Sequence, residues 1–329
     1  MSLMTRLLLH LLAAGMVAVG AGPAAAQIGR TPDGQPDIQG FWNNATLTPL
    51  ERGLITVTMA ERVSLPGIYS LAVSDQEARE LENRIAGLVS FDRRDGGVDS
   101  DVSRAFNNLF NDRGTALARV DGVKRTSLIV DPPEGRIPPL TPEGERRQAA
   151  HQHGFGSVSE RPLEERCLVS VGSAAGPPML PAAYNNNYQI VQAPGVVMIF
   201  AEMLHEVRIV RLGATHAPPH VRQWLGDSIG HWEGDTLVVE TTNFNDQTAF
   251  RGASANLRVT ERFRQVDAKT LVYRATMEDP AAFTRPWTIE YPFTSTPGPL
   301  YEYACHEGNY AITGILGGAR KADGAAPKQ

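Results

Sequence analysis

Two ionisable residues stand in otherwise apolar strand patterns of this chain. In residues 197–209 every second residue is apolar except His205, and in residues 257–263 every second residue is apolar except Glu261. Alternate residues of a strand share one face, so both side chains would point into the interior of a sheet. A histidine that titrates near neutral pH and a buried carboxylate are the groups that acid/base catalysis needs. The pattern predicts His205 as a base and Glu261 as its charge partner or as the acid.

Each of the two residues also has a purely structural interpretation. A histidine in a protein core is often satisfied by a backbone carbonyl group, which would leave His205 without a chemical role. A buried carboxylate costs free energy unless it is paired, so Glu261 should meet an arginine, a histidine or a tyrosine, or be protonated. The sequence leaves open whether Glu261 belongs to a structural ion pair or to an acid/base pair.

Polar residues that could bind a substrate precede these strands. Tyr184 offers a phenol for proton transfer, and the amides Asn185–Asn187 follow it directly. Consecutive amides can hold a turn by bonds from side chain to backbone, or they can bind the hydroxyl groups of a ligand. We expect Tyr184 as a third catalytic residue and Asn186 and Asn187 as substrate-binding residues, with the turn as the alternative.

Two further groups of residues lie where strands are expected to begin or end. Arg285 and Trp287 place a guanidinium and an indole near one strand end, which suits a polar or aromatic ligand and equally a lid latched by an ion pair. His306 and Glu307 follow an expected last strand, Tyr301–Cys305, and could form the rim of a site or a simple strand edge. We expect all four to position a substrate.

Short strands must position these residues. From residue 188 onward the apolar period is two, and about nine strands follow one another at hairpin spacing. This pattern predicts a mainly β fold, an antiparallel meander that forms a lipocalin-like barrel or a sandwich, with an N-terminal segment that carries two short helices. We expect a signal peptide at 1–26, an extended and helical segment packed on the barrel at 27–165, the barrel domain at 166–318 and a disordered tail at 319–329.

The two helices are predicted from their first residues. Ser74 and Glu77 form a capping box, which predicts a helix from Asp75 to about residue 88. Thr141 followed by Pro142 is the pattern of an N-cap and a first helical position, so a second helix should begin there.

The beginning of the chain and its composition indicate where the protein works. Arg6, an apolar run at 7–19 and a small-residue cleavage site at 24–26 are typical of a signal peptide, so we expect a periplasmic or secreted protein without membrane insertion after cleavage. The formal net charge is −5 without a basic cluster, which disfavours nucleic acid as a partner. The expected partner is a small molecule.

The two cysteines, Cys167 and Cys305, are candidates for a disulfide because exported chains meet an oxidising environment, with two buried thiols as the alternative. A catalytic role of Cys305 with His306 is disfavoured, because neighbours in a strand face opposite sides. The prolines between His216 and His220 rule out the helical spacing of a zinc site. We therefore expect neither a metal nor an organic cofactor.

Several motifs of this chain occur together elsewhere. They are WLGDS at 224–228, WEGDTLVVETTNF at 232–244, TRPW at 284–287 and YEYACHEGNY at 301–310. With them, nearly the whole mature chain resembles a large family of exported bacterial proteins that is common in soil bacteria. That family has no agreed activity or catalytic residues, so the resemblance implies export and no particular chemistry.

Three functions are compatible with these observations. The first is an exported, cofactor-independent lyase, isomerase or hydrolase that acts on a small hydroxylated or aromatic molecule by proton transfer inside the barrel. The second is a lipocalin-like carrier, whose pocket would be mostly apolar with few convergent ionisable groups. The third is a cell-surface interaction module, which would have a filled core and an exposed aromatic patch. The placement of His205 relative to Glu261 discriminates between the first two.

Overall fold

The computed structural model describes most of the chain, namely residues 29–57, 62–90, 92, 97, 108–150, 154–170, 173–247 and 250–324. The expected signal peptide at 1–26 and the end of the expected tail lie outside these residues.

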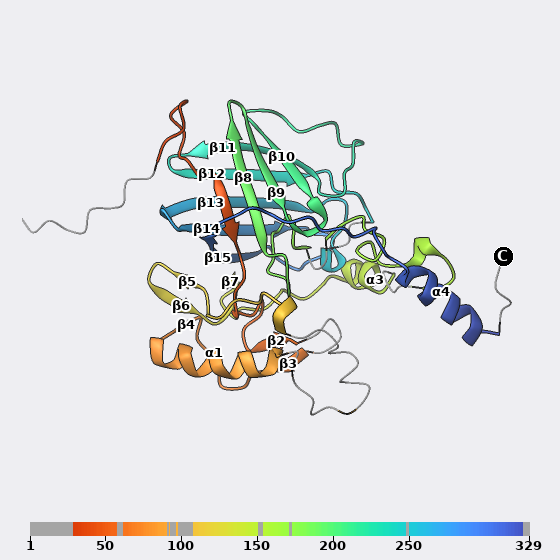
Figure 1. The fold of residues 1–329 in the computed structure, drawn as a ribbon. Coiled ribbons are helices and arrows are strands. Elements are labelled where there is room, and N and C mark those ends of the chain that lie inside the picture. The colour runs from red at the N-terminus through yellow and green to blue at the C-terminus, as the bar shows by residue number, and fades with distance from the viewer. Residues whose placement is uncertain are drawn as a thin grey trace, which may run out of the picture.

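Nine strands close into a β-barrel, which occupies the upper half of Figure 1. They follow the order β1-β8-β9-β10-β11-β12-β13-β14-β15, and β1 pairs with both β8 and β15, which closes the ring. A short strand, β7, pairs with the beginning of β15. The bounds are β1 Gly40–Asn43, β7 Ile129–Asp131, β8 Asn187–Ala193, β9 Val196–Ala201, β10 Val207–Leu212, β11 Asp227–Glu233, β12 Thr236–Thr242, β13 Arg258–Asp267, β14 Thr270–Glu278 and β15 Trp287–Ser295.

The expected mainly β barrel is confirmed, with three differences in its construction. The strand that closes the ring, β1, comes from the segment 27–165, which we expected only to pack against the barrel. β10 and β11 pair in parallel, so the meander is interrupted by a crossover through residues 213–226. The expected last strand at 301–305 is irregular chain.

The N-terminal segment builds a second, smaller core below the barrel (Figure 1). Helix α1, Asp75–Val89, begins at the expected capping box, in which Ser74 and Glu77 exchange hydrogen bonds. Its buried face packs against two small sheets, one of strands β2 and β3 and one in the order β4-β6-β5. Their bounds are β2 Leu54–Thr56, β3 Arg62–Ser64, β4 Ala72–Val73, β5 Arg119–Val120 and β6 Val123–Arg125.

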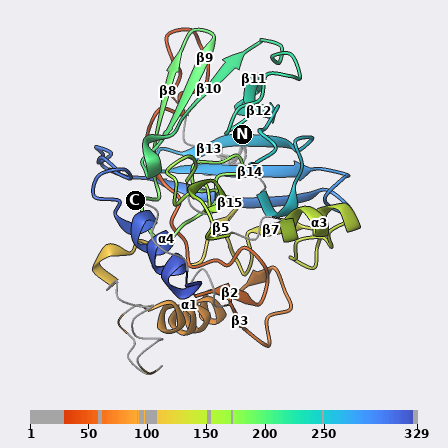
Figure 2. The same cartoon turned by 90° about the vertical axis from the view of Figure 1, so that its right-hand side faces the viewer.

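Two further helices flank the barrel. Helix α3, Pro142–Ala150, begins as expected, because the hydroxyl of Thr141 accepts the backbone N–H of Gly144. Helix α4, Ala311–Ala322, extends to the right-hand side of the molecule in Figure 1 and therefore lies in front in Figure 2. The expectation of a disordered tail from residue 319 is therefore wrong for the first residues of that range. Short 3₁₀ turns are η1 Asn108–Phe110, η2 Val158–Glu160, η4 Met203–His205 and η5 Phe250–Gly252.

The interior of the barrel is filled by side chains. Aromatic rings from β8, β13, β14 and β15 contact one another there in stacked, tilted and edge-to-face arrangements, at centroid separations of 5.1 to 5.8 Å. All of them are fully buried: Tyr188, Phe263, Tyr273, Tyr291 and Phe293. Within the described part of the chain, no helix has the length and the apolar composition that crossing a bilayer would require.

Candidate functional site

Glu261 lies in the barrel interior, as the alternation of its strand predicts. Its side chain is fully buried and accepts two hydrogen bonds from the guanidinium of Arg208, at 2.6 and 2.9 Å. The hydroxyl of Tyr273 donates a third bond to it at 2.8 Å. Burial and the neighbouring carboxylate raise the pKa of Tyr273 well above its usual range. Glu261 thus has the arginine and tyrosine partners that a buried carboxylate requires.

His205, in contrast, lies outside the barrel, and its expected inward position is wrong. Leu204 and His205 adopt left-handed backbone conformations in η4, with φ of 58° and 51°. This turn reverses the alternation, so Arg208 faces the interior in β10 while Val207 and Ile209 are exposed. The predicted acid/base pair of His205 and Glu261 is therefore not assembled.

The imidazole of His205 has a structural partner instead. Its Nε2 accepts the backbone N–H of Tyr303 at 2.8 Å, which requires an unprotonated nitrogen at that position. Its ring also stacks on Phe200, 6.3 Å between centroids. His205 thereby attaches the irregular C-terminal segment to the outside of the barrel.

The chain itself occupies the space that a lipocalin would offer to a ligand. The segment 173–181 enters the barrel, and Met179 is fully buried there. The backbone N–H of Met179 donates to the hydroxyl of Tyr273 at 2.9 Å, and its carbonyl accepts from the hydroxyl of Tyr291 at 2.7 Å. We call residues 173–181 the plug. The buried tyrosines thus hold a segment of the same chain.

The asparagines after Tyr184 stabilise a turn at the beginning of β8. Asn186 is fully buried, accepts the N–H of Ala182 and donates to the carbonyl oxygens of Ala182 and Asp112, so it is not available to a ligand. Asn185 and Asn187 donate to the two carboxylate oxygens of Glu202, at 2.6 and 3.0 Å. The substrate-binding role predicted for Asn186 and Asn187 gives way to the structural alternative.

Arg285 and Trp287 lie at the opposite end of β15 from this turn. Trp287 begins β15, whereas Thr294 near its end pairs with Asn43, the neighbour of Asn187. Trp287 is fully buried and stacks on aromatic rings. Arg285 is exposed and binds Asp131 at 2.8 Å. An ion pair that latches a loop therefore fits Arg285 better than substrate binding does. Neither Arg285 nor Trp287 lies near the predicted site residues Asn186 and Asn187.

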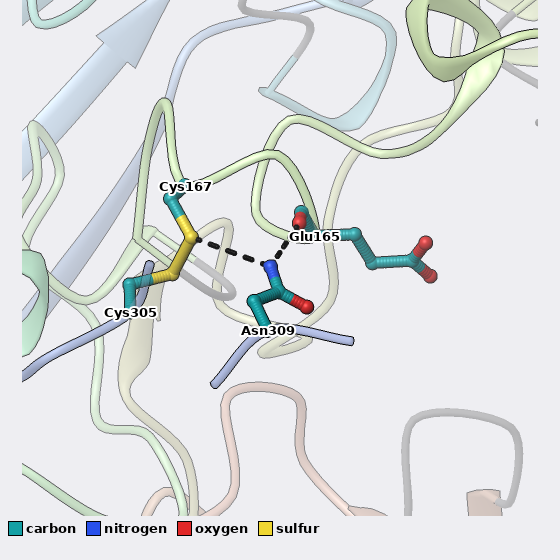
Figure 3. The surroundings of a disulfide bond; sticks show 4 residues. All are labelled: Glu165, Cys167, Cys305 and Asn309. Atoms are coloured by element: carbon teal, nitrogen blue, oxygen red, sulfur yellow. Dashed lines mark hydrogen bonds between the residues drawn. A yellow bond between two sulfur atoms is a disulfide. The ribbon is translucent and has the colours of Figure 1, made fainter. Parts of the chain in front are cut away.

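The C-terminal segment does bring several predicted residues together. Cys167 and Cys305 form a disulfide, which was one of the two alternatives that the sequence left open. The bridge holds residues 301–310 against residues 164–167. Asn309 donates to the carbonyl oxygen of Glu165 and to the sulfur of Cys167, so the disulfide and one amide clamp the same turn (Figure 3). We call residues 301–310 the C-terminal ribbon.

Beside the ribbon lies an open cleft with a volume of about 500 Å³, which we call the disulfide cleft. One wall is apolar and comes from α4, with Ile312 and Ile315. The remaining lining is mainly polar, with three carboxylates, two amides and a phenol: Glu164, Glu165, Glu302, Asn185, Asn309 and Tyr303. Glu165 is neutralised by Arg161, which lies outside the lining. The described lining residues include no lysine or arginine, so Glu164 and Glu302 make the cleft acidic.

The predicted residues Tyr184, His306 and Glu307 are not part of the lining of this cleft, although Tyr184 precedes Asn185 and His306 follows Cys305, both of which are. The ring of Tyr184 stacks on that of Tyr303, with centroids 6.5 Å apart and planes inclined by 7°. Burial, together with the neighbouring phenol of Tyr184, raises the pKa of Tyr303 to about 12, so the phenol of Tyr303 can donate a hydrogen bond at neutral pH. His306 and Glu307 lie exposed in the turn that follows Cys305.

Glu206, which the sequence pattern did not single out, has the most unusual carboxyl group at this end of the barrel. Its carboxylate accepts the backbone N–H of Ser170 at 3.2 Å. Burial raises the pKa of Glu206 to about 7, although Ser170 and Arg208 act in the opposite direction. The sequence does not indicate that Glu206 is partly buried, because its burial follows from the turn η4, which reverses the alternation of buried and exposed positions.

A second group of ionisable residues surrounds His216 outside the barrel. Its two ring nitrogens lie 2.9 Å from Asp227 and 3.1 Å from Glu240. Asp227 also accepts from Arg211 and from the backbone N–H of Ala217. These contacts outweigh burial and hold the pKa of Asp227 below its usual range. Among the described residues, no group of three or more histidine, cysteine, aspartate or glutamate side chains could hold a metal ion.

Comparisons with known proteins do not add to this geometry, since neither a protein-family model nor a curated protein nor a solved structure matches the chain.

Proposed function

We propose that this protein is an exported small-molecule-binding protein whose ligand is a hydroxylated or aromatic compound, bound in the disulfide cleft. One observation carries the proposal. The barrel interior is occupied by the plug, while the cleft outside collects carboxylates, amides and the phenol of Tyr303 beside a covalently held ribbon.

The lining of the cleft supports a neutral or cationic ligand that carries hydroxyl groups. Carboxylates accept hydrogen bonds from hydroxyl groups, and amides both donate and accept them. Tyr303 and the apolar side of α4 offer surface to a ring or a hydrocarbon. An anionic ligand is disfavoured, because Glu164 and Glu302 would repel it without a neighbouring cation in the lining.

The ribbon supports binding because it is held before a ligand arrives. The disulfide, the two bonds of Asn309 and the contact between His205 and Tyr303 fix its backbone. A site whose groups are already ordered loses less conformational entropy on binding.

Export to the periplasm or the medium is part of the same proposal. Disulfides persist in oxidising compartments and are rare in the cytosol, and the bridge between Cys167 and Cys305 fits such an environment. The proposed signal peptide and the resemblance to exported bacterial proteins point in the same direction.

The proposal is tested in two stages. Purified protein is incubated with an extract of its growth medium, and mass spectrometry identifies retained compounds. Calorimetry then compares these compounds with neutral saccharides, phenols and dicarboxylates, of which the dicarboxylates should not bind. Glu302→Gln should weaken binding roughly tenfold, as expected for a lost hydrogen bond to a charged group.

Glu278→Gln is the matched control, because Glu278 is exposed at the end of β14, away from the cleft lining. Equal affinity of the wild type and Glu302→Gln for the retained compound would contradict the proposed site. If the protein converts the retained compound into another, the protein is an enzyme and the proposal of a pure binding protein is contradicted.

An acid/base enzyme is the second candidate, and the raised pKa of Glu206 favours it. A carboxyl group with a pKa of about 7 can both accept and donate a proton at neutral pH. In this case Glu206→Gln should lower turnover of the retained compound by roughly 10²- to 10⁴-fold while the protein stays folded. Unchanged turnover in that variant would exclude Glu206 as the catalytic group.

A further inference from the structure

The parallel pairing of β10 with β11 leaves an opening in the barrel wall. The two strands pair only at Val210–Leu212 with Ser228–Gly230, and they converge towards the top of Figure 2. The first half of β10, Val207–Ile209, pairs with β9 on one side and, among the strands that the structure describes, has no partner on the other. Residues 222–228, which lead into β11, lie across this free edge and enclose a cleft of about 510 Å³ with it. We call this cleft the seam.

One part of the seam is apolar and exposed. Val207 and Ile209 retain 46% and 49% of their surface exposed, which is unusual for neighbouring positions on one strand face. Trp224 and Leu225 face the same cleft from the opposite segment and are half-buried. These four side chains form an apolar surface, and removing it from water by binding an apolar group would be favourable.

The segment that carries Trp224 is held in place by close backbone packing. Gly226 has a φ of +71°, and a Cβ at this position would lie 2.6 Å from the carbonyl oxygen of Thr242. Only glycine allows this approach. The wall of the seam is therefore fixed by the fold and does not depend on a ligand.

The other part of the seam is cationic. Three of its lining residues are arginines and one is an aspartate: Arg208, Arg211, Arg222 and Asp227. Arg208 is neutralised by Glu261 and Arg211 by Asp227, so Arg222 adds one uncompensated positive charge. Among the described residues, the guanidinium of Arg222 makes one hydrogen bond, to the carbonyl oxygen of Ala255, and its other donors stay open.

Two further arginines at the seam have side-chain N–H groups without a protein acceptor among the described residues. Arg211 uses one terminal nitrogen, Nη2, for both oxygens of Asp227, so its Nη1 and Nε remain open. Arg208 is 3% exposed, and its Nε has no hydrogen-bond partner in the described part of the chain. A buried donor without a partner costs free energy, and an anion beside it would remove that cost.

We propose that the seam is a binding site for a small organic anion with an apolar body, such as an aromatic or aliphatic carboxylate. The carboxylate binds Arg222 and Arg211, whose planar guanidinium groups suit it. The hydrocarbon covers Val207 and Ile209. The site is separate from the acidic disulfide cleft, and the charge of its ligand is opposite to what that cleft accepts, so the two proposals succeed or fail independently.

The test uses 4-phenylbutyrate as the probe and 4-phenylbutanol as its neutral counterpart, titrated into the full mature protein by calorimetry. The carboxylate should bind at least roughly tenfold more tightly than the alcohol, because only the anion makes charge-assisted hydrogen bonds. Its affinity should fall with added salt. Equal affinities of the two compounds, or no binding of the carboxylate, would overturn the proposal.

Variants locate the site. Arg222→Gln should weaken binding of 4-phenylbutyrate roughly tenfold, and Arg222→Lys less, because lysine keeps the charge but not the planar fork. Arg262→Gln is the control for charge, since Arg262 is a half-buried arginine on β13, outside the seam, that pairs with Glu233. A loss of the same size in Arg222→Gln and Arg262→Gln would show a general charge effect and contradict the site.

The apolar part is tested in the same way. Ile209→Ser should weaken binding of both the carboxylate and the alcohol by roughly five- to tenfold, from the apolar area that it removes. Val123→Ser is its control, because Val123 is an exposed apolar residue of β6 outside the seam. Unchanged binding in Ile209→Ser would exclude the strand face from the site.

Discussion

At the scale of single residues, the carboxylate of Glu261 connects three strands of the barrel. It comes from β13 and binds Arg208 on β10 and Tyr273 on β14. Such a pair contributes little compared with apolar residues of the same size, but removing one partner leaves a buried charge. The role that we assign to Glu261 is therefore to fix how these strands pack.

This role predicts a large loss of stability in Glu261→Gln. The variant should lower the free energy of unfolding by about 3–5 kcal/mol, because Arg208 loses its counter-charge in the interior. Urea unfolding followed by circular dichroism measures it. Glu233→Gln, which removes a solvent-exposed ion pair with Arg262, should change the free energy of unfolding far less, because water screens that pair. Similar losses in both variants would mean that the interior pair is not desolvated.

Glu206 predicts a dependence of stability on pH. Its pKa is raised to about 7 in the folded protein, so the folded state binds this proton more tightly than the unfolded state. Its contribution is therefore fully present below pH 4.5, the ordinary value, and is lost as the pH rises through about 7. Glu206→Gln should stabilise the protein at pH 8 by up to about 3 kcal/mol and change little at pH 4.

The measurement for Glu206 is urea unfolding of wild type and variant at pH 4, 6 and 8. Glu278→Gln, which replaces an exposed carboxylate, should show the same stability difference from wild type at all three pH values. A difference for Glu206→Gln that does not change with pH would contradict the assigned shielding.

Glu261 and His205 show which side-chain positions could be predicted from the sequence and which could not. The alternation in residues 257–263 placed Glu261 correctly, and the cost of a buried charge predicted the kind of partner it has. The same reasoning failed for His205, because two residues in left-handed conformation shift the strand by one position. Non-glycine residues rarely adopt that conformation, and local sequence gives no sign of it here.

At the scale of elements, the sequence predicted best those parts whose signal is local. The capping box at Ser74 and the Thr141-Pro142 pair gave both helix starts, since the caps are made by residues next to each other. The closing strand β1 and the plug were not predicted. Both depend on contacts with residues more than 90 positions away in the chain, and the local alternation of apolar and polar residues cannot predict such contacts.

The plug predicts that its tyrosines contribute to stability through hydrogen bonds. In Tyr291→Phe, the carbonyl oxygen of Met179 loses its donor and Asn44 loses an acceptor, all in the interior. Each buried group left without a partner costs about 1–3 kcal/mol. Urea unfolding should show that loss, and hydrogen exchange should show faster exchange at residues 173–181.

Tyr69→Phe is the control for that prediction, because Tyr69 is 87% exposed and its hydroxyl reaches solvent. It should leave both the stability and the exchange of the plug unchanged. If Tyr291→Phe behaves like this control, the plug is held by apolar packing alone.

At the scale of the whole molecule, the ring of strands uses both halves of the chain. β1 from the N-terminal segment fills the gap between β8 and β15, so the barrel cannot close without residues 40–43. The disulfide then joins the segment before the plug to the segment after β15. The disulfide cleft combines residues up to 151 positions apart along the chain, from Glu164 to Ile315, and the disulfide holds their two segments side by side.

The disulfide predicts a coupled loss of stability and of binding. Replacing Cys167 and Cys305 by serine opens a loop of 138 residues and should lower the free energy of unfolding by about 2–5 kcal/mol. It also releases the ribbon, so a ligand of the disulfide cleft should bind more weakly, whereas 4-phenylbutyrate at the seam should bind as in the wild type. Calorimetry of the double variant with both ligands, at a temperature where circular dichroism shows it folded, makes the comparison. Equal weakening of both ligands would show that the bridge supports the whole barrel and not the ribbon in particular.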